Sequence, residues 1–252
     1  MPKQSGHIKI RGTVDDLTYV KTKDGFSVRK ATVVPKGRMF KDPRFKRTRE
    51  NLQEFNEAAK SNMLIRESFT SLTKTIADKR MMNRLTAELF PVIRSDAQNP
   101  RGYRKAVFGD LSKLKGFEFN AINPFRLAFS EKPIPAVNRV TGQISIQVPD
   151  YTPAIALKYP LEATHYRFVF AAAALDFHNG LYVKDVLLGD KQLLDELPVA
   201  GYSETLQLPA NSSDPVFIVM GIEFFQKSED GLLSLLTNGS FSSLQLILVD
   251  QQ

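Results

Sequence analysis

The sequence predicts an α+β protein: an N-terminal β-hairpin and a helical segment followed by an antiparallel β-sandwich of the jelly-roll or immunoglobulin-like type. Two observations predict this class. Between residues 42 and 95, apolar residues recur at spacings of three and four, which is typical of amphipathic helices. From Phe117 onward, short alternating runs are separated by prolines, which is typical of sandwiches and jelly rolls. The expected domains are residues 1–41, 42–116 and 117–252.

Residues 7–34 predict a small β element at the front of the chain. Alternating apolar and polar side chains begin at Ile8, resume at Leu17 and continue from Phe26 to Val34. Lys23-Asp24-Gly25 predicts a turn, because Asp-Gly accepts the positive φ angles of tight hairpins. Two or three short strands are barely stable alone. The element is therefore expected to pack on the helices, on the back domain or on a neighbouring subunit.

Asp42-Pro43 predicts the start of the first helix. An aspartate accepts hydrogen bonds from the free amides of the first turn, and proline suits the first helical position. The residues that follow place an apolar stripe on one face of the helix, and we favour burial of this stripe in the core. Its members are Phe45, Thr48, Leu52, Phe55 and Ala59. The side chains off that stripe are expected to be solvated: Glu50, Glu54, Glu57 and Lys60.

Two further helical stripes follow. The second comprises Ile65, Phe69, Leu72 and Ile76, and the third comprises Met82, Leu85, Leu89 and Ile93. Pro91 is expected to bend or end the third helix near its last turn. Asn99-Pro100-Arg101-Gly102 predicts a break in the helical region. A short helical turn is expected at Asp110–Lys115, closed by Gly116.

The back half predicts the strands of the sandwich. The strongest hairpin signal is His178-Asn179-Gly180, which lies between apolar runs at Tyr166–Asp176 and Leu181–Leu188. The other expected strands are Phe117–Phe119, Phe125–Phe129, Gln143–Val148, Thr205–Leu208, Val216–Phe225, Leu232–Leu236 and Leu244–Val249.

Charge is divided unevenly along the chain. Residues 1–120 hold 26 Lys and Arg against 13 Asp and Glu, a net of +13, and residues 121–252 hold 8 against 14, a net of −6. Such asymmetry indicates a nucleic-acid or other polyanionic partner for the front. It fits equally well with front-to-back contact between copies of the chain.

The densest positive charge lies around the start of the first helix. Cations are mildly unfavourable there, because the amino end of a helix carries partial positive charge. The cluster is interpreted as a surface for phosphates or for an acidic face of another copy; the alternative is a solvated segment offset by Glu50 and Glu54. The residues assigned to polyanion or subunit contact are Lys36, Arg38, Lys41, Arg44, Lys46, Arg47 and Arg49.

Two other sets of residues are assigned to subunit contact. The first lies on the front β element and comprises Ile8, Ile10, Tyr19 and Phe26. The second is an acidic stretch in the back half, interpreted either as a solvated loop or as the counterpart of the basic cluster in another copy: Asp185, Asp190, Asp195 and Glu196.

No sequence motif assigns a catalytic, cofactor-binding or metal-ligating residue. The chain has no cysteine, and it lacks the glycine-rich phosphate loops and the Gly-x-Ser-x-Gly nucleophile motif. His165 and His178, with Asp176, could meet at a metal, but no close ligand pair supports such a site. The expectation is a protein that is not an enzyme and needs no cofactor.

We expect neither a secretory signal nor a membrane span. No apolar run follows the first charges, and the longest apolar run, Phe168–Leu175, has eight residues against the roughly 20 that a bilayer requires. We expect synthesis in the cytoplasm without membrane contact. Extracellular or virion-associated release stays open at this point.

The front half contains a strand at Gly12–Tyr19, a turn at Asp24-Gly25, the segment Asp42–Asn51 and a helix with Glu54-Phe55 and Ala58-Ala59-Lys60. Together these segments resemble a group of uncharacterised proteins from Bacteroidota. These proteins have a β-rich back half, and the resemblance covers most of the chain. It implies the order of elements and a source phylum. The group has no known activity from which a function could be implied.

The sequence therefore favours a non-enzymatic structural protein that assembles with other copies of itself. The basic front of one copy would bind the acidic back of the next, head to tail, in a filament, tube or lattice. The alternative is a nucleic-acid-binding protein whose basic front contacts phosphates. A phage-derived origin fits both interpretations by analogy only.

Overall fold

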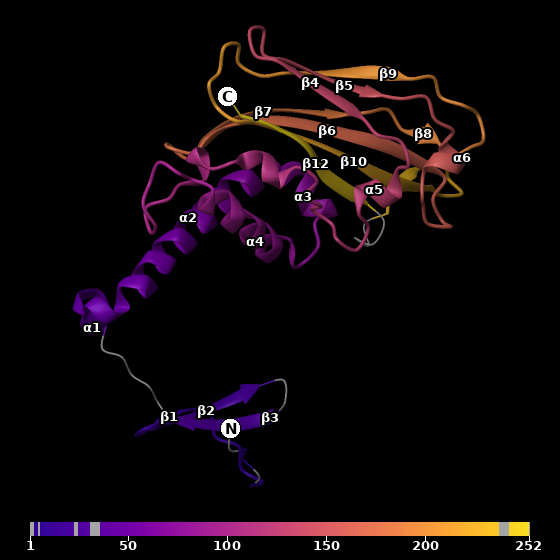
Figure 1. Cartoon of the computed structure of the whole chain (residues 1–252). Coiled ribbons are helices and arrows are strands. Elements are labelled where there is room, and N and C mark those ends of the chain that lie inside the picture. Colours follow the sequence, from indigo (N-terminus) through magenta and orange to yellow (C-terminus); the bar gives the residue numbers. More distant parts are fainter. Residues whose placement is uncertain (1–2, 5, 23–24, 31–35, 237–241, 252) are drawn as a thin grey trace. The chain divides into compact units, whose positions relative to one another are not determined.

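A computed structural model describes residues 3–4, 6–22, 25–30, 36–236 and 242–251. It contains helices and antiparallel sheets, which confirms the α+β class (Figure 1). The chain divides into two compact units, Met1–Arg49 and Glu50–Gln252, which we call the small unit and the large unit. The domain boundaries expected near residues 41 and 116 stay predictions.

The small unit contains a three-stranded antiparallel sheet of β1 (Gly12–Val14), β2 (Leu17–Thr22) and β3 (Gly25–Lys30). The expected front β element is thus present, but its first strand is later than predicted. The prediction of a strand at Ile8–Ile10 is wrong, because Ile8 ends a bend and Lys9 and Ile10 have no regular secondary structure before β1. The predicted turn at Lys23-Asp24 and the predicted extension to Val34 lie outside the described residues.

Helices follow the sheet in the small unit. Helix α1 (Lys36–Lys41), which the sequence did not indicate, precedes a 3₁₀ turn, η1 (Pro43–Phe45), that runs into α2 (Lys46–Ser68). The predicted start at Asp42-Pro43 is confirmed. Asp42 has extended backbone angles, its carboxylate accepts a hydrogen bond from the backbone N–H of Arg44 at 3.0 Å, and Pro43 occupies the first helical position.

The large unit continues α2 and adds α3 (Thr70–Ile76), α4 (Met81–Arg94), η2 (Ala106–Phe108) and η3 (Leu111–Leu114). The second predicted stripe is confirmed, since all four of its side chains are buried: Ile65, Phe69, Leu72 and Ile76. The third is confirmed except at its first residue, because Met81 is buried and Met82 is exposed. Helix α4 ends at Arg94, within one turn of Pro91.

The first predicted stripe is wrong about which face of α2 is buried. Leu52 and Phe55 are exposed, whereas Glu54 retains only 5% exposure. The buried face is shifted by one residue and comprises Glu54, Ala58, Ser61, Asn62, Leu64, Ile65 and Ser68. The reason is the loop at residues 101–105, which covers the acidic side of the helix.

Two long strands form the centre of the main sheet. Strand β6 (His165–Asp176) pairs along its length with β10 (Val216–Lys227). Beside β6 lie β7 (Leu181–Leu188) and β8 (Gln192–Leu193). The predicted hairpin between β6 and β7 is confirmed: Gly180 has φ +69°, and Asp176 accepts hydrogen bonds from the backbone N–H groups of His178 and Asn179.

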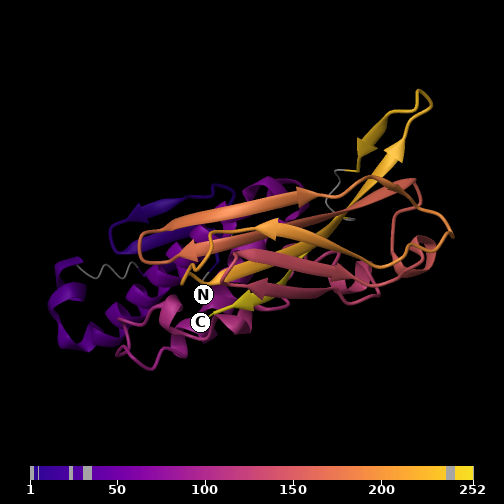
Figure 2. The ribbon, with the colours of Figure 1, turned by 90° about the horizontal axis from the view of Figure 1, so that it is seen from above.

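The other side of β10 carries β11 (Leu233–Leu235) and β12 (Ser243–Asp250). The end of β10 and β11 project as a hairpin beyond the rest of the sheet (Figure 2). Strand β12 contains a bulge opposite Ile218 and Val219, where Ile247 is the additional residue. Because the additional residue shifts the alternation of side chains, Ile247 and Leu248 both pack in the core between the sheets, and Val249 returns to the helix side that Leu246 occupies.

A second antiparallel sheet consists of β4 (Ile134–Asn138), β5 (Gln143–Val148) and β9 (Tyr202–Gln207). Two short helices, α5 (Phe125–Ala128) and α6 (Pro153–Ala156), lie near the sheets. The predicted strand at Phe125–Phe129 is wrong. These phenylalanines are four residues apart, a spacing that also fits one face of a helical turn, and their rings lie 6.1 Å apart in the core.

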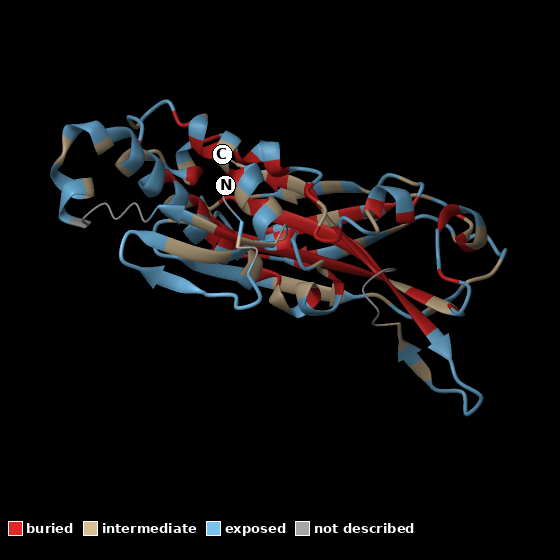
Figure 3. Ribbon diagram, turned by 90° about the horizontal axis from the view of Figure 1, so that it is seen from below, coloured by how far each residue is buried: buried red, intermediate tan, exposed pale blue. Residues whose placement is uncertain are grey.

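The large unit has three layers: helices α2–α4, the main sheet and the second sheet (Figure 1). One core lies between the helices and the main sheet, and the other lies between the two sheets. The central strands are buried on both faces, as the red ribbon in Figure 3 shows. The jelly-roll or immunoglobulin-like type stays a prediction. Among the described residues, no helix combines the length and apolar character needed to cross a membrane.

Candidate functional site

The predicted basic cluster begins on α1 and continues into α2. Arg38 and Lys41 lie in the last turn of α1, where positive charge is favourable beside the helix carboxyl end. This placement removes part of the repulsion expected from the sequence, because these cations belong to a separate helix. The backbone of Lys36 opens α1, and Lys41 and Lys46 are exposed.

Asp42 is the anionic centre of this cluster. Its carboxylate lies 2.8 Å from the Arg44 guanidinium and 3.4 Å from that of Arg38. The hydrogen bonds from Arg44, together with the nearby charge of Arg38, lower the pKa of Asp42 to about 2. Asp42 therefore remains ionised at neutral pH and offsets part of the surrounding positive charge.

Arg49 has a structural role within the small unit. Its guanidinium donates hydrogen bonds to the carbonyl oxygens of Met39 at 2.8 Å and Asp42 at 3.1 Å. These acceptors include a carbonyl at the end of α1, which the helix itself leaves unsatisfied. Arg49 thus holds the turn between α1 and α2, whereas Arg44 and Arg47 extend the exposed basic surface.

The small sheet gathers positive charge around one aromatic ring. Lys9 Nζ, Arg11 Cζ and Lys21 Nζ lie 5.9, 5.9 and 5.8 Å from the centroid of the Phe26 ring. Cations are attracted to the face of an aromatic ring, but three like charges also repel one another. Because an anionic partner would relieve that repulsion, this group is a candidate anion-binding surface, which we call the Phe26 cluster.

The apolar face of the small sheet adjoins the Phe26 cluster. Pairing of β2 with β3 places Tyr19 opposite Val28 and Lys21 opposite Phe26, so these four side chains share one face. Pairing of β1 with β2 adds Val14 to the same face, where it is exposed. Of the predicted contact residues, Tyr19 and Phe26 therefore come together, while Ile8 and Ile10 are exposed ahead of β1.

The four predicted acidic residues have different surroundings. Asp185, on β7, accepts a hydrogen bond from the backbone N–H of Gln207 at 2.8 Å and so links the two sheets. Asp195 accepts one from the backbone N–H of Leu197 at 3.1 Å and shapes the loop after β8. Asp190 and Glu196 are exposed, so these two remain the candidates for contact with a cationic surface.

Asp190 lies beside a second acid that the sequence reasoning missed. A cavity of about 130 Å³ is lined by Phe168, Gly189, Asp190, Gln192, Tyr202 and Glu204. Burial, followed by the negative charge of Asp190, raises the pKa of Glu204. The proximity of β7's end to β9 produces this pair, and no spacing in the sequence indicates it.

A buried tyrosine network lies behind that cavity. The hydroxyl groups of Tyr151 and Tyr166 are 2.7 Å apart, and Tyr166 donates to Gln192 Oε1 at 2.6 Å. Burial raises the pKa of both tyrosines and of Tyr202. These phenols therefore stay protonated at neutral pH and act as hydrogen-bond donors within the core.

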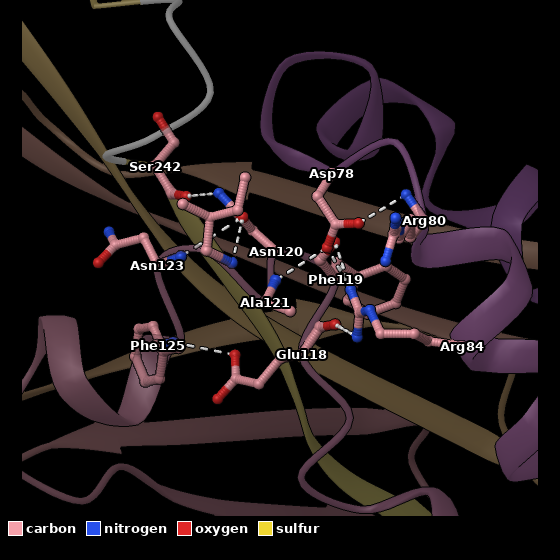
Figure 4. A network of polar contacts seen from close by, with 11 residues as sticks. Asp78, Arg80, Arg84, Glu118, Phe119, Asn120, Ala121, Asn123, Phe125 and Ser242 are labelled. Atoms are coloured by element: carbon pink, nitrogen blue, oxygen red, sulfur yellow. Dashed lines mark hydrogen bonds and ion pairs between the residues drawn. The ribbon is translucent and has the colours of Figure 1, made fainter. Parts of the chain in front are cut away.

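A second polar network fastens the helices to the main sheet (Figure 4). Arg84 donates to the carbonyl oxygens of Glu118 at 2.7 Å and Phe119 at 3.3 Å and forms an ion pair with Asp78. Burial alone would raise the pKa of Asp78. Hydrogen bonds from the backbone N–H groups of Ala121 and Arg80, and from the Arg84 side chain, outweigh it and hold that pKa below its ordinary value.

Glu118 and Asn120 extend this network toward the sheets. Both oxygens of Glu118 are engaged, one by the backbone N–H of Phe125 at 2.9 Å and the other by the Gln245 amide at 2.6 Å. Burial nevertheless raises the pKa of Glu118. Asn120 donates to the carbonyl oxygen of Ser242 at 2.7 Å. Because neighbouring protein groups occupy both Glu118 oxygens and the Asn120 amide, this part of the network has a structural role.

A third network joins α2 to the loop after α4, whose three cations pair with acids of the helix. Glu50 lies 3.6 Å from Arg101, Glu54 lies 3.8 Å from Arg104, and Glu57 lies 3.1 Å from Lys105. Glu54 also accepts a hydrogen bond from the backbone N–H of Gly102 at 3.0 Å. Gly102, with φ +88°, allows this approach, because a Cβ there would lie 3.0 Å from the Glu50 side chain.

The residues considered for a metal site do not meet. His165 opens β6, whereas Asp176 and His178 lie at the opposite end of that strand. The His178 ring packs against Phe108 with the ring centroids 5.8 Å apart. In the part of the chain that the structure describes, no group of three or more His, Cys, Asp or Glu side chains is arranged to hold a metal ion.

Comparison of the chain with protein-family models, with curated proteins and with solved structures finds no match. The resemblance to Bacteroidota proteins stays a prediction.

Proposed function

We propose that the protein is a non-enzymatic structural protein that assembles head to tail. The cationic small unit of one copy would bind an acidic surface on the large unit of the next. Such a contact joins two different surfaces, so repetition produces a ring or a helical filament, and lateral contacts would extend it to a tube or lattice.

The observation that carries this proposal is the division of charge between the two units. The small unit has 14 Lys and Arg against four Asp, a net of +10, and the large unit has 20 against 23 Asp and Glu, a net of −3. Opposite net charges steer two copies toward a head-to-tail encounter, and like charges oppose head-to-head contact.

The small sheet supplies the apolar part of the contact. Val14 and Leu17 are exposed on the face that also carries Tyr19 and Phe26. Among the described residues, β1 pairs only with β2, so its outer edge offers free backbone groups to another chain. Exposed strand edges favour pairing with other chains, and burial of the apolar face would stabilise the contact.

The test compares two full-length variants of equal net charge by sedimentation velocity across a concentration series. One replaces Lys9, Arg11 and Lys21 with Gln in the Phe26 cluster. The control replaces the exposed Lys60, Lys74 and Lys79 of the large unit with Gln. The proposal expects weaker assembly only for the first variant and slower assembly in high salt. Wild-type protein that stays monomeric at high concentration in low salt would contradict it.

Nucleic-acid binding is the second candidate function, and the Phe26 cluster favours it. Single-stranded nucleic acids are held by aromatic rings that stack on bases beside cations that contact phosphates. Phe26 and Tyr19 share a face with Lys21. Binding of a fluorescent single-stranded oligonucleotide that disappears in Phe26→Ala, while assembly persists, would favour this function over the first.

A further inference from the structure

Helices α2 and α4 form an apolar groove on the large unit. The helices run antiparallel, since Asn62 of α2 donates to the carbonyl oxygen of Met82 at 2.7 Å and the Phe55 and Phe90 rings lie 6.3 Å apart. The groove has a volume of about 670 Å³. Its apolar lining consists of Phe55, Ala59, Met82, Ala87, Phe90 and Pro91.

The charged residues that line this groove are both arginines. Arg66 lies one turn beyond Asn62 on α2, and Arg94 lies one turn beyond Phe90 on α4, with its guanidinium 5.7 Å from the Phe90 ring. Because the helices are antiparallel, the two arginines lie at opposite ends of the groove. A complementary ligand would be apolar in the middle and negatively charged at its margins.

The large unit carries a surface of that kind near α6 and β8. We define the apolar tip as four exposed side chains: Ile155, Leu161, Leu193 and Leu197, whose exposed fractions are 84%, 100%, 58% and 69%. The segments that bear them are joined near the start of β6. Leu193 pairs with His165, and the backbone N–H of Ala154 donates to the carbonyl oxygen of Asp195 at 3.0 Å.

Four carboxylates are close to residues of the apolar tip in the sequence. Glu162 follows Leu161, and Asp190, Asp195 and Glu196 flank Leu193 and Leu197. Two cations, Lys158 and Lys191, also lie in these segments, and Lys191 is placed over the Phe225 ring at 4.6 Å. The segments that bear the tip thus carry these four carboxylates against two lysines, and their net negative charge complements the arginine-flanked groove.

The groove and the tip lie in different parts of the large unit. Helix α2 adjoins the β6–β7 turn, since Glu57 and Leu64 line one cavity together with Phe177 and His178. The tip lies at the other end of β6, a strand whose 12 residues span roughly 40 Å at ~3.3 Å each. Figure 1 likewise places α6 and β8 away from α2. The tip of one copy therefore reaches the groove only of another copy.

We infer that the apolar tip of one copy docks in the α2–α4 groove of the next copy, with Glu196 and neighbouring carboxylates beside Arg66 and Arg94. This inference rests on the proposed function, because it adds a second pair of surfaces, both on the large unit, to the contact that the small unit would make. Docking of the tip in the groove would bury apolar side chains and so stabilise a complex whose formation is promoted by opposite charges. Large exposed apolar side chains commonly mark such a contact when several lie together.

The experiment uses three full-length variants. Phe55→Ser changes the groove, and Leu193→Ser with Leu197→Ser changes the tip. Leu181→Ser is the control, because Leu181 is 64% exposed on β7 and lies outside the tip. All these side chains are exposed, so the fold should be retained, as thermal unfolding would verify. Sedimentation should show self-association at least tenfold weaker for the groove and tip variants and unchanged for the control.

A mixture of the groove variant and the tip variant gives the sharpest result. Each retains one competent surface, so the mixture should form 1:1 pairs with close to wild-type affinity, whereas each variant alone should self-associate at least tenfold more weakly. If wild-type protein assembles and both variants assemble equally well, the docking inference is wrong and the proposed function stands. If wild-type protein never assembles, both are wrong.

Discussion

The carboxylate of Glu54 lies 3.8 Å from the Arg104 guanidinium, although some 50 residues separate them in the sequence. This pair, and the hydrogen bond from the Gly102 backbone N–H to Glu54, fix which face of α2 is buried. Breaking a buried pair by removing one partner is costly, because the remaining charge is left without compensation.

We predict that Glu54→Leu destabilises the large unit by about 3–5 kcal/mol, although Leu is apolar and a better match for a core position in the sequence pattern. Glu54→Gln should cost less, since its amide oxygen can still accept the bond from Gly102. Urea unfolding followed by circular dichroism measures both. Equal stability of Glu54→Leu and wild type would contradict the role assigned to this pair.

The pH dependence of stability should involve Asp78. Its pKa is lowered on folding from an ordinary value of 3.8, so its stabilisation is present above that value and is lost as the pH falls through the lowered pKa. Asp78→Asn should cost about 1.5–3 kcal/mol at pH 7. The difference from wild type should shrink as the solution is acidified toward pH ~3, below the ordinary pKa of an aspartate. Urea unfolding at a series of pH values checks this, and a constant difference would count against it.

The tyrosine network should contribute to stability through its hydroxyl groups. Tyr166→Phe removes the bonds to Tyr151 and Gln192 and leaves their buried polar groups underpaired, at a cost of about 1–3 kcal/mol. Tyr103→Phe is the control, because Tyr103 is exposed.

Burial raises the pKa of Tyr151 and Tyr166 from 10.0. Phenolate absorbance should therefore show fewer tyrosines titrating near that pH in native protein than in unfolded protein.

Close packing at Gly221 gives a prediction about the main sheet. A Cβ at this position would lie 2.3 Å from the carbonyl oxygen of Ser243 and 2.9 Å from Leu244. Gly221→Ala should therefore force β10 and β12 apart and cost about 1–3 kcal/mol or more. Gly37→Ala, in α1, meets no atom within 4 Å and should not destabilise the protein. Thermal unfolding of the two variants distinguishes these outcomes.

The basic cluster gives a prediction about salt. If Lys41 and Lys46 neutralise phosphates, replacing both with Gln should lower the log–log salt slope of duplex DNA binding by about 0.9 for each phosphate that is no longer neutralised. Lys74 and Lys79, exposed on the large unit, provide the control variant. Fluorescence anisotropy over a salt series measures the slopes. Absence of any DNA binding by wild type in low salt would remove the nucleic-acid candidate.

The sequence could predict elements whose determinants are local. The β6–β7 hairpin was predictable because Asp176, Asn179 and Gly180 specify the turn between them. The stripe from Ile65 to Ile76 was predictable because every member is apolar at helical spacing. The start at Asp42 depends on a cap two residues from its partner.

Elements decided by distant partners could not be predicted in this way. The choice between Phe55 and Glu54 for the buried side of α2 depends on a loop some 50 residues later. Strand β4 contains Pro135, which argued against a strand; it is tolerated because β4 is at the edge of its sheet. The pairing of Asp190 with Glu204 likewise arises only when β7 and β9 come together.

The packing of the helices against β12 has a consequence for folding during synthesis on the ribosome. The core beneath α2–α4 includes Leu244, Leu246 and Val249, yet β12 begins at Ser243, about 150 residues after α4 ends. At a translation rate of ~5–20 residues per second, roughly 8–30 s pass between synthesis of the helices and synthesis of the strand that completes their core. During that interval Ile65 and Leu89 lack their final cover. Translation speed and chaperone supply should therefore influence the yield of folded protein more strongly than the stability of the finished fold suggests.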